Sequence, residues 1–343
     1  MSLVELVPPN RLGPALARAT GDPRWCSFEA SLITGGKSNL TFEITSEAGT
    51  LILRRPPSGK LLPSAHDMSR ETRIQRALAS TSVPVPKVVL HEASGDLLGV
   101  PFYVMEKVPG HVIRTRLPDG YARSPTEKLA LADTMVDVLA DLHAIDPKAI
   151  GLADYGRPYG YVERQILRWI SQWEKTKTHE VKAVDELGWR LKRLLPQDQL
   201  ESIVHGDYRL DNCLMALTGP IRITAVLDWE LSTLGDPLTD LGLLLFYWRE
   251  SEEDEPTLTP AVTRNPGFPK RAHLIQRYAQ RTGATLDDIA FYEAFAHFKF
   301  AAIAQGIVAR VAASAMAGQD FGNLDAEILR ITEEGIVRLE QKG

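Results

Sequence analysis

The most informative stretch of the sequence is Ile203-Val204-His205-Gly206-Asp207-Tyr208-Arg209-Leu210-Asp211-Asn212, followed after a second apolar segment by Ala225-Val226-Leu227-Asp228. Apolar, β-forming residues stand on both sides of the polar part, which predicts a loop between two strands. Asp207 and Asn212 lie five residues apart on that loop, and Asp228 comes at the end of the following strand. The segment therefore places two carboxylates and one amide on loops at the ends of predicted strands.

These three side chains match the requirements of phosphoryl transfer from a nucleotide. That reaction needs a carboxylate that orients the acceptor hydroxyl and takes its proton, together with an amide and a second carboxylate that hold magnesium. A lone H-x-D pattern predicts little, since it arises by chance. The H-x-D-x-x-x-x-N spacing, the strand setting and the downstream Asp228 together favour catalysis over a set of loop-capping residues.

Outside this segment the chain changes character at about residue 107. The first third predicts strand, turn, strand, strand, helix, strand and strand, with the helix over 68–79 ended by Val83-Pro84-Val85-Pro86. The remainder predicts mainly helices, over about 129–142, 163–177 and 286–317. The acidic run at 250–255 is expected to be a solvated loop.

Composition bounds the class of protein. With 343 residues, of which 44% are hydrophobic, the chain suggests two domains or two lobes, at about 150 residues per domain. With a net charge of -5 and scattered basic residues, the sequence predicts no positively charged surface that would bind nucleic acid or an anionic membrane. Two cysteines, no long uninterrupted apolar run and no secretory signal predict a cytoplasmic protein that does not enter a membrane.

The H-G-D loop and its surroundings resemble the aminoglycoside phosphotransferase-like kinases, which share the protein-kinase fold. The resemblance runs from about Leu32 to the C-terminal helices. The sequence is most similar to the phosphotransferase domain that is fused to acyl-CoA dehydrogenases or acts beside them. The segments that carry this narrower resemblance are 53–59, 62–66, 70–71, 102–106 and 227–242.

The resemblance implies an α+β, protein-kinase-like fold of two lobes. A β-rich nucleotide-binding lobe is expected over 1–106 and a larger, mostly helical catalytic and substrate lobe over 107–343, with ATP between them. Asp207 matches the catalytic base, and Asn212 and Asp228 match ligands of Mg²⁺. His205 is expected to orient the loop. Asp240 either accepts hydrogen bonds from that loop or caps the helix that follows.

Further residues are implied for the nucleotide. The turn that contains Gly35, Gly36, Ser38 and Asn39 matches a hairpin whose backbone N–H groups approach the phosphates, with an ordinary hairpin as the alternative. A Walker A loop is excluded, because Ser31 replaces the required glycine and a strand follows the serine. The backbone of Glu106 and Val108 matches the hinge that binds adenine.

Arg54 stands where the family usually has a phosphate-binding lysine, with Glu71 as the expected partner. Arginine supplies the same charge in a different geometry. A surface ion pair is the alternative interpretation of these two residues. On the substrate side, Arg164 and Arg168 could face the phosphates of coenzyme A, or form a solvated helix face.

The leading hypothesis is therefore a Mg-ATP-dependent phosphotransferase acting on the hydroxyl of a small molecule. The resemblance implies a hydroxyacyl-CoA of the 4-hydroxyacyl type and a functional link to an acyl-CoA dehydrogenase. Aminoglycoside, choline or homoserine acceptors remain open within the same chemistry. Two other classes are a nucleotide-binding pseudokinase, disfavoured by the intact Asp207, Asn212 and Asp228, and a metal-dependent hydrolase, disfavoured by the amide at Asn212.

Overall fold

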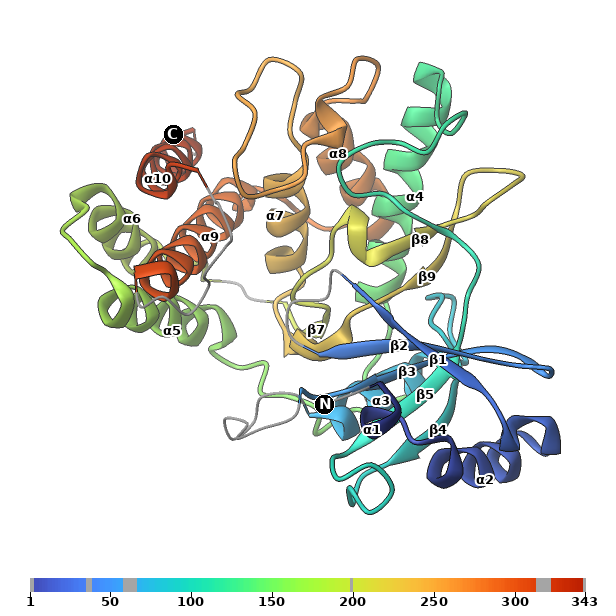
Figure 1. Ribbon diagram of the computed structural model, residues 1–343. Coiled ribbons are helices and arrows are strands. Elements are labelled where there is room, and N and C mark those ends of the chain that lie inside the picture. The colour runs from blue at the N-terminus through green and yellow to red at the C-terminus, as the bar shows by residue number, and fades with distance from the viewer. Residues whose placement is uncertain (1–2, 35–38, 58–66, 198–199, 313–321, 342–343) are drawn as a thin grey trace. The chain divides into compact units, whose positions relative to one another are not determined.

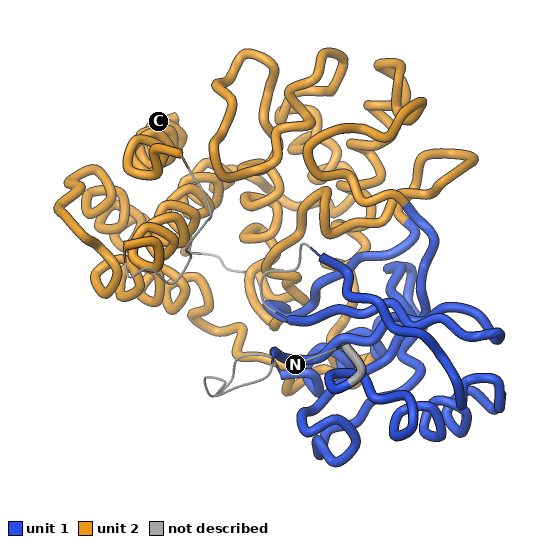
Figure 2. The backbone as a smooth tube through the Cα atoms, in the orientation of Figure 1, with its two compact units in different colours: residues 1–110, 224–232 blue, residues 111–223, 233–343 orange. Residues whose placement is uncertain are grey.

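The structure is a computed structural model that describes residues 3–34, 39–57, 67–197, 200–312 and 322–341. The chain divides into two compact units, which Figure 2 shows in different colours. Unit 1 comprises residues 1–110 and 224–232, and unit 2 comprises residues 111–223 and 233–343. The short second segment of unit 1 contains Asp228, so this residue belongs to the same unit as the N-terminal sheet.

In the described residues, unit 1 is built on a five-stranded sheet with the order β1-β2-β3-β5-β4 (Figure 1). All neighbouring strands are antiparallel. Helix α3 (Met68–Leu78) packs on β4 and β5. The strands are β1 (Glu29–Ile33), β2 (Leu40–Ser46), β3 (Gly49–Arg55), β4 (Val88–Glu92) and β5 (Phe102–Glu106). This agrees with the predicted order of five strands around one helix.

The core of unit 1 follows from the two-residue period of its strands. Phe42 and Ile44 of β2 are fully buried, as are Phe102 and Val104 of β5. They pack with residues of α2 (Pro9–Thr20), a helix that the sequence did not lead us to expect. Two prolines and Gly13 obscure its periodicity. Gly13 is required because a Cβ there would lie 2.4 Å from the carbonyl oxygen of Cys26.

In its described part, unit 2 is mostly helical and is organised around α9 (Ile289–Ala312). This helix packs against α5, α6, α7 and α10, and its apolar residues are largely buried (Figure 1). The other helices are α4 (Pro125–His143), α5 (Tyr161–Thr176), α6 (Lys182–Arg193), α7 (Leu238–Tyr247), α8 (Arg271–Thr282) and α10 (Leu324–Glu340).

Short strands frame the predicted catalytic loop. Strand β7 (Ser202–Val204) pairs with β10 (Thr233–Gly235), and β8 (Cys213–Met215) pairs with β6 (His111–Val112), both antiparallel. Strand β9 (Ile223–Val226) begins in unit 2 and continues into unit 1. The loop His205–Asn212 is therefore held at both ends by strands of unit 2, as the sequence predicted.

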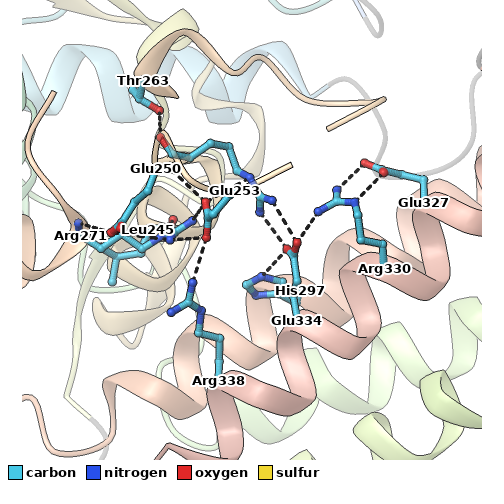
Figure 3. Close-up of polar contacts among 11 residues, drawn as sticks. Leu245, Glu250, Glu253, Thr263, Arg271, His297, Glu327, Arg330, Glu334 and Arg338 are labelled. Carbon is cyan, nitrogen blue, oxygen red and sulfur yellow. Dashed lines mark hydrogen bonds and ion pairs between the residues drawn. The ribbon is translucent and has the colours of Figure 1, made fainter. Parts of the chain in front are cut away.

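The acidic run is a loop, and most of its residues are exposed as predicted, but the prediction was wrong for Glu250 and Glu253. Figure 3 shows that both carboxylates belong to a network of polar contacts with arginine side chains. Arg271 donates to Glu253 at 2.6 and 2.7 Å, and its backbone N–H donates to Glu250 at 2.8 Å. Arg338 also contacts Glu253, at 3.1 Å. The sequence did not indicate this arrangement, because Arg271 and Arg338 come from helices elsewhere along the chain.

In the part of the chain that the structure describes, we find no helix whose length and apolar character would let it cross a membrane.

Candidate active site

In the loop after β7, the side chains of Asp207 and Asn212 are joined by a hydrogen bond. The side-chain amide of Asn212 donates to the Asp207 carboxylate at 2.9 Å and to the Asp207 backbone carbonyl at 2.8 Å. Asn212 is 7% exposed, whereas the Asp207 side chain is 23% exposed. The five-residue spacing, closed by a 3₁₀ turn at Leu210–Asn212, therefore presents one carboxylate in a fixed position with access to a ligand.

Asp240, near the start of α7, holds the beginning of this loop. Its carboxylate accepts from the backbone N–H groups of His205 at 2.6 Å and Gly206 at 2.8 Å. Burial would raise the pKa of Asp240, but His143, His205 and the Gly206 N–H together lower it below the usual range. The helix-capping alternative does not describe Asp240, because Asp236 accepts from the Leu238 N–H at the start of α7.

His205 is completely buried and takes part in the same loop geometry. The backbone N–H of Asp207 donates to its Nδ1 at 3.2 Å. Gly206 adopts φ +83°, a left-handed conformation that glycine tolerates at no steric cost. These contacts fit the expected orienting role of His205.

Two cations beside Asp207 were missed by the sequence reasoning. The Nε of Arg209 lies 3.2 Å from Asp207 and 3.2 Å from Asp211. The Nζ of Lys299, on α9, donates to the carbonyl of Gly206 at 2.9 Å. Burial lowers the pKa of Lys299, although the charges of Asp207 and Asp240 act in the opposite direction. The available signal was a lysine flanked by apolar residues, in the segment Phe298-Lys299-Phe300.

Unit 1 carries a second polar cluster, centred on Arg54 of β3. Its Nε lies 3.0 Å from Glu71 of α3, and its Nη2 lies 2.5 Å from Asp228 and 3.3 Å from Glu230. Arg54 and Glu71 are not a surface pair, because their side chains are only 13% and 1% exposed. The sequence predicted the Arg54–Glu71 pair but not Glu230, which lies two residues beyond Asp228.

The charged groups of this cluster shift one another's pKa values. Burial raises the pKa of the Glu71 carboxyl to about 7, although Arg54 and the Tyr103 hydroxyl act in the opposite direction. That hydroxyl donates to Glu71 at 3.0 Å. Burial alone would lower the pKa of Arg54, yet the neighbouring carboxylates raise it above its ordinary value. The guanidinium is therefore permanently charged.

Asp228 has a left-handed backbone, with φ 66°. Within the described residues only Ala122 and Asp228 combine a side chain with such a φ. Aspartate tolerates this region better than most residues, and strained backbone of this kind clusters at functional sites. The conformation precedes the 3₁₀ turn Trp229–Leu231 and leaves the Asp228 side chain 31% exposed.

The structure describes only some of the remaining residues that were predicted to bind the nucleotide. Asn39 is buried, and its amide donates to Glu71 at 3.2 Å and Glu230 at 3.1 Å, so it joins the Arg54 cluster. Gly35, Gly36 and Ser38 lie outside the described residues. Glu106 ends β5, and its backbone N–H donates to the Lys87 carbonyl at 2.9 Å. Val108 is half-buried just beyond.

The two arginines predicted for the substrate make separate contacts on α5. The guanidinium of Arg164 donates to the backbone carbonyls of Arg157 and Tyr159, just before its own helix. Arg168 lies over the ring of Trp169, 5.3 Å from its centroid. Their role towards coenzyme A stays a prediction.

In the described part of unit 2, two small pockets lie beside the loop, each with a cavity of about 20 Å³. One is mainly apolar and includes Arg114, Arg209 and Asp211. The other is lined by residues of α5, α7 and α9 and by Gly206, and it includes Trp169 and Lys299.

A strand–loop–strand with a fixed Asp–Asn pair, joined in one chain to an antiparallel sheet with a buried Arg–Glu pair, defines a kinase-like phosphotransferase. Comparison with known proteins agrees with this class. Residues 29–292 match the sequence profile of the phosphotransferase enzyme family APH, and the chain belongs to this family. The predicted α+β, kinase-like fold class is confirmed.

Curated relatives carry this region as one part of a longer protein. The rat acyl-CoA dehydrogenase family member 11 is 39% identical over 285 residues, which cover 80% of this chain and 35% of the rat protein. The human protein of the same name is 36% identical over 300 residues, covering 84% of this chain and 37% of the human one. The chain thus spans little more than a third of the length of these relatives.

Solved structures show the same architecture. A crystal structure from Ralstonia eutropha, of a candidate aminoglycoside phosphotransferase, is 35% identical with a TM-score of 0.80, covering 92% of this chain and 93% of that one. Choline kinase from Cryptosporidium parvum is 12% identical with a TM-score of 0.64, covering 96% and 94%. The second likeness shows the fold alone.

Proposed function

We propose that this chain transfers the γ-phosphoryl group of Mg-ATP to the hydroxyl of a small molecule. The observation that carries the proposal is the Asp207–Asn212 pair, joined at 2.9 Å on a loop whose backbone is held by Asp240. A related fold, a mutant of aminoglycoside phosphotransferase APH(4)-Ia that is 17% identical, has been crystallised with ADP and hygromycin B. That complex supports nucleotide binding as a property of the fold.

Asp207 is proposed to accept the proton of the acceptor hydroxyl and to orient its oxygen towards the phosphorus. The partly exposed carboxylate suits this role, while His205 is too buried to exchange a proton with a substrate. The Asn212 amide keeps the Asp207 carboxylate in one orientation. Arg54 supplies a permanent positive charge in the nucleotide-binding unit.

The donor set fits magnesium. Asn212 and Asp228 offer an amide oxygen and a carboxylate, which are the hard ligands this ion prefers. Among the described residues no group of three or more His, Cys, Asp or Glu side chains is placed to hold a metal. Mg²⁺ commonly takes one or two protein ligands and completes its shell with water and substrate phosphates. When bound, the ion would neutralise charge on the phosphates.

The acceptor is proposed to be a hydroxyacyl-CoA ester of the 4-hydroxyacyl type. The support is the 35–39% identity to acyl-CoA dehydrogenase family members 10 and 11, which place a similar segment in one chain with an acyl-CoA enzyme by name. A functional link to an acyl-CoA dehydrogenase is part of the same proposal. Choline, homoserine and aminoglycosides are the alternative acceptors.

One screen tests the proposal. Purified protein is incubated with Mg-ATP and, separately, a 4-hydroxyacyl-CoA, the free hydroxy acid, choline, homoserine and an aminoglycoside, and ADP and the phosphorylated product are quantified. We expect product with a hydroxyacyl substrate, formed about 10²- to 10⁴-fold more slowly by Asp207→Asn. Nucleotide binding without product from any acceptor would instead indicate a pseudokinase.

A further inference from the structure

A small pocket in unit 2 carries chemistry that the phosphoryl-transfer mechanism leaves unused. It is lined by Gly206, the residue immediately before Asp207, and by side chains of three helices. Tyr161, Leu243 and Phe295 supply apolar surface, while Gln165, Trp169 and Lys299 supply polar groups. Its cavity of about 20 Å³ has room for one water-sized group, so an acceptor whose hydroxyl reaches Asp207 would place a single oxygen there.

The polar groups of this pocket are mainly hydrogen-bond donors with unused capacity. Lys299 uses one N–H on the Gly206 carbonyl, and an ammonium group has three. The indole Nε1 of Trp169 is buried and has no hydrogen-bond partner within the described part of the chain. A buried donor left without a partner is uncommon in a folded protein and calls for a ligand or water.

Two acceptor groups of the pocket are already engaged. The Asp240 carboxylate accepts from His205, Gly206 and His143, the last at 3.4 Å. The Gly206 carbonyl accepts from Lys299. An incoming ligand group therefore meets the remaining donor capacity of Lys299 and Trp169, which fits an oxygen that accepts hydrogen bonds.

The other pocket lacks this character, because its lining is mainly apolar. Of its two arginines, Arg209 lies between the carboxylates of Asp207 and Asp211, each at 3.2 Å, and contacts the Tyr247 ring at 5.1 Å. The second, Arg114, is exposed. The pocket at Lys299 and Trp169 is the better candidate for binding an acceptor oxygen.

We propose that Lys299 and Trp169 form a specificity-determining subsite, in which both donate hydrogen bonds to a carbonyl or carboxylate oxygen of the acceptor. This inference rests on the proposed phosphotransferase function and assigns the residues that choose among its acceptors. The hydroxyl to be phosphorylated lies at Asp207, and the acyl oxygen lies in the pocket. Cationic acceptors such as choline are disfavoured by the like charge of Lys299.

The test compares two variants with two matched controls. Lys299→Met removes the charge and Trp169→Phe removes only the indole N–H donor. Lys192→Met and Trp189→Phe change the same residue types at exposed positions on α6. Thermal melting establishes that each variant is folded. Each is assayed with a 4-hydroxyacyl-CoA and with the free hydroxy acid, which separates a thioester carbonyl from a carboxylate as the group recognised.

We expect Lys299→Met to raise the acceptor KM roughly 10- to 100-fold, and Trp169→Phe to raise it about 2- to 10-fold, as for charged and neutral hydrogen bonds. The KM for ATP should stay within about twofold. Because Nε1 has no hydrogen-bond partner among the described residues, Trp169→Phe reports ligand contact without disturbing the loop. A fall in kcat at unchanged acceptor KM in both variants would overturn the subsite, as would a preference of the wild type for choline.

Failure of the proposed function gives a different result. If no acceptor yields a phosphorylated product, calorimetric titration with 4-hydroxybutanoate still tests the subsite without turnover. Binding to the wild type that is lost in Lys299→Met and retained in Lys192→Met would support the subsite on its own. Equal binding, or no binding, across all variants would overturn it.

Discussion

Glu334 and Glu340 on α10 offer a matched test of how the ionic network of unit 2 stabilises the helices around α9. Both glutamates pair with an arginine, but in different surroundings. Glu334 accepts from Arg249 at 2.8 and 3.0 Å, and Arg249 is only 2% exposed. Glu340 contacts Arg190 at 2.9 Å, with side chains 60% and 30% exposed. We expect Glu334→Gln to destabilise the protein far more than Glu340→Gln.

The magnitude follows from what each substitution leaves behind. Removing one partner of a buried ion pair costs about 3–5 kcal/mol, because the remaining charge stays desolvated. Glutamine retains a hydrogen-bond acceptor and Glu334 is 28% exposed, which lowers the expected loss to about 2–4 kcal/mol. An exposed pair contributes less than about 1 kcal/mol, so Glu340→Gln should fall within that limit.

The measurement is a urea titration at pH 7, repeated at lower pH, with the free energy of unfolding extrapolated to water. Burial would raise the pKa of Glu334, but His297, Arg249 and Arg330 hold it well below its ordinary value. Its stabilising contribution is therefore present above the pKa of the unfolded chain, 4.5, and is lost as the pH falls below it. The gap between wild type and Glu334→Gln should narrow below pH 4.5. Equal losses for the two variants at pH 7 would refute the reasoning.

Three further predictions concern catalysis. Asp207→Asn should lower kcat about 10²- to 10⁴-fold, as for loss of a general base, with the nucleotide Kd within about twofold; a parallel loss of nucleotide binding in a calorimetric titration would argue against the assignment. Asp228→Ala should abolish the magnesium dependence of ATP binding, and an unchanged magnesium titration would exclude Asp228 as a ligand. Arg54→Lys should raise the KM for ATP about 10-fold, because a point charge cannot reach Glu71 and Asp228 together as the guanidinium does; a KM unchanged within twofold would show that the guanidinium geometry is not needed.

Local spacing explains why the catalytic loop could be predicted. Asp207, Asn212 and the two flanking strands lie within fourteen residues, from Ser202 to Met215, so their arrangement depends on little beyond their own segment. The five strands of unit 1 were also predicted, because two-residue alternation and turn residues are local signals. The Arg54–Glu71 pair followed from a resemblance and not from spacing.

Long-range partners explain what could not be predicted. Lys299 reaches Gly206 across 93 residues, and Arg271 binds Glu253 across 18. Helix α2 was missed because Pro9 and Pro14 suggest breaks, although a proline in the first helical turn costs no hydrogen bond. In each case the decisive fact is a contact or a helix position that a linear pattern does not encode.

The charge of the Arg54 cluster accounts for the magnesium requirement that we propose. Among the described residues, one guanidinium faces the carboxylates of Glu71, Asp228 and Glu230, so full ionisation would leave a net charge of 1 − 3 = −2. Burial raises the pKa of Glu71 to about 7, which neutralises part of this excess near pH 7. Free ATP, itself an anion, would be repelled by what remains, whereas a divalent cation would be attracted. The chain's overall charge of -5 does not encode this local balance, because the balance depends on which charged side chains of unit 1 the fold brings together.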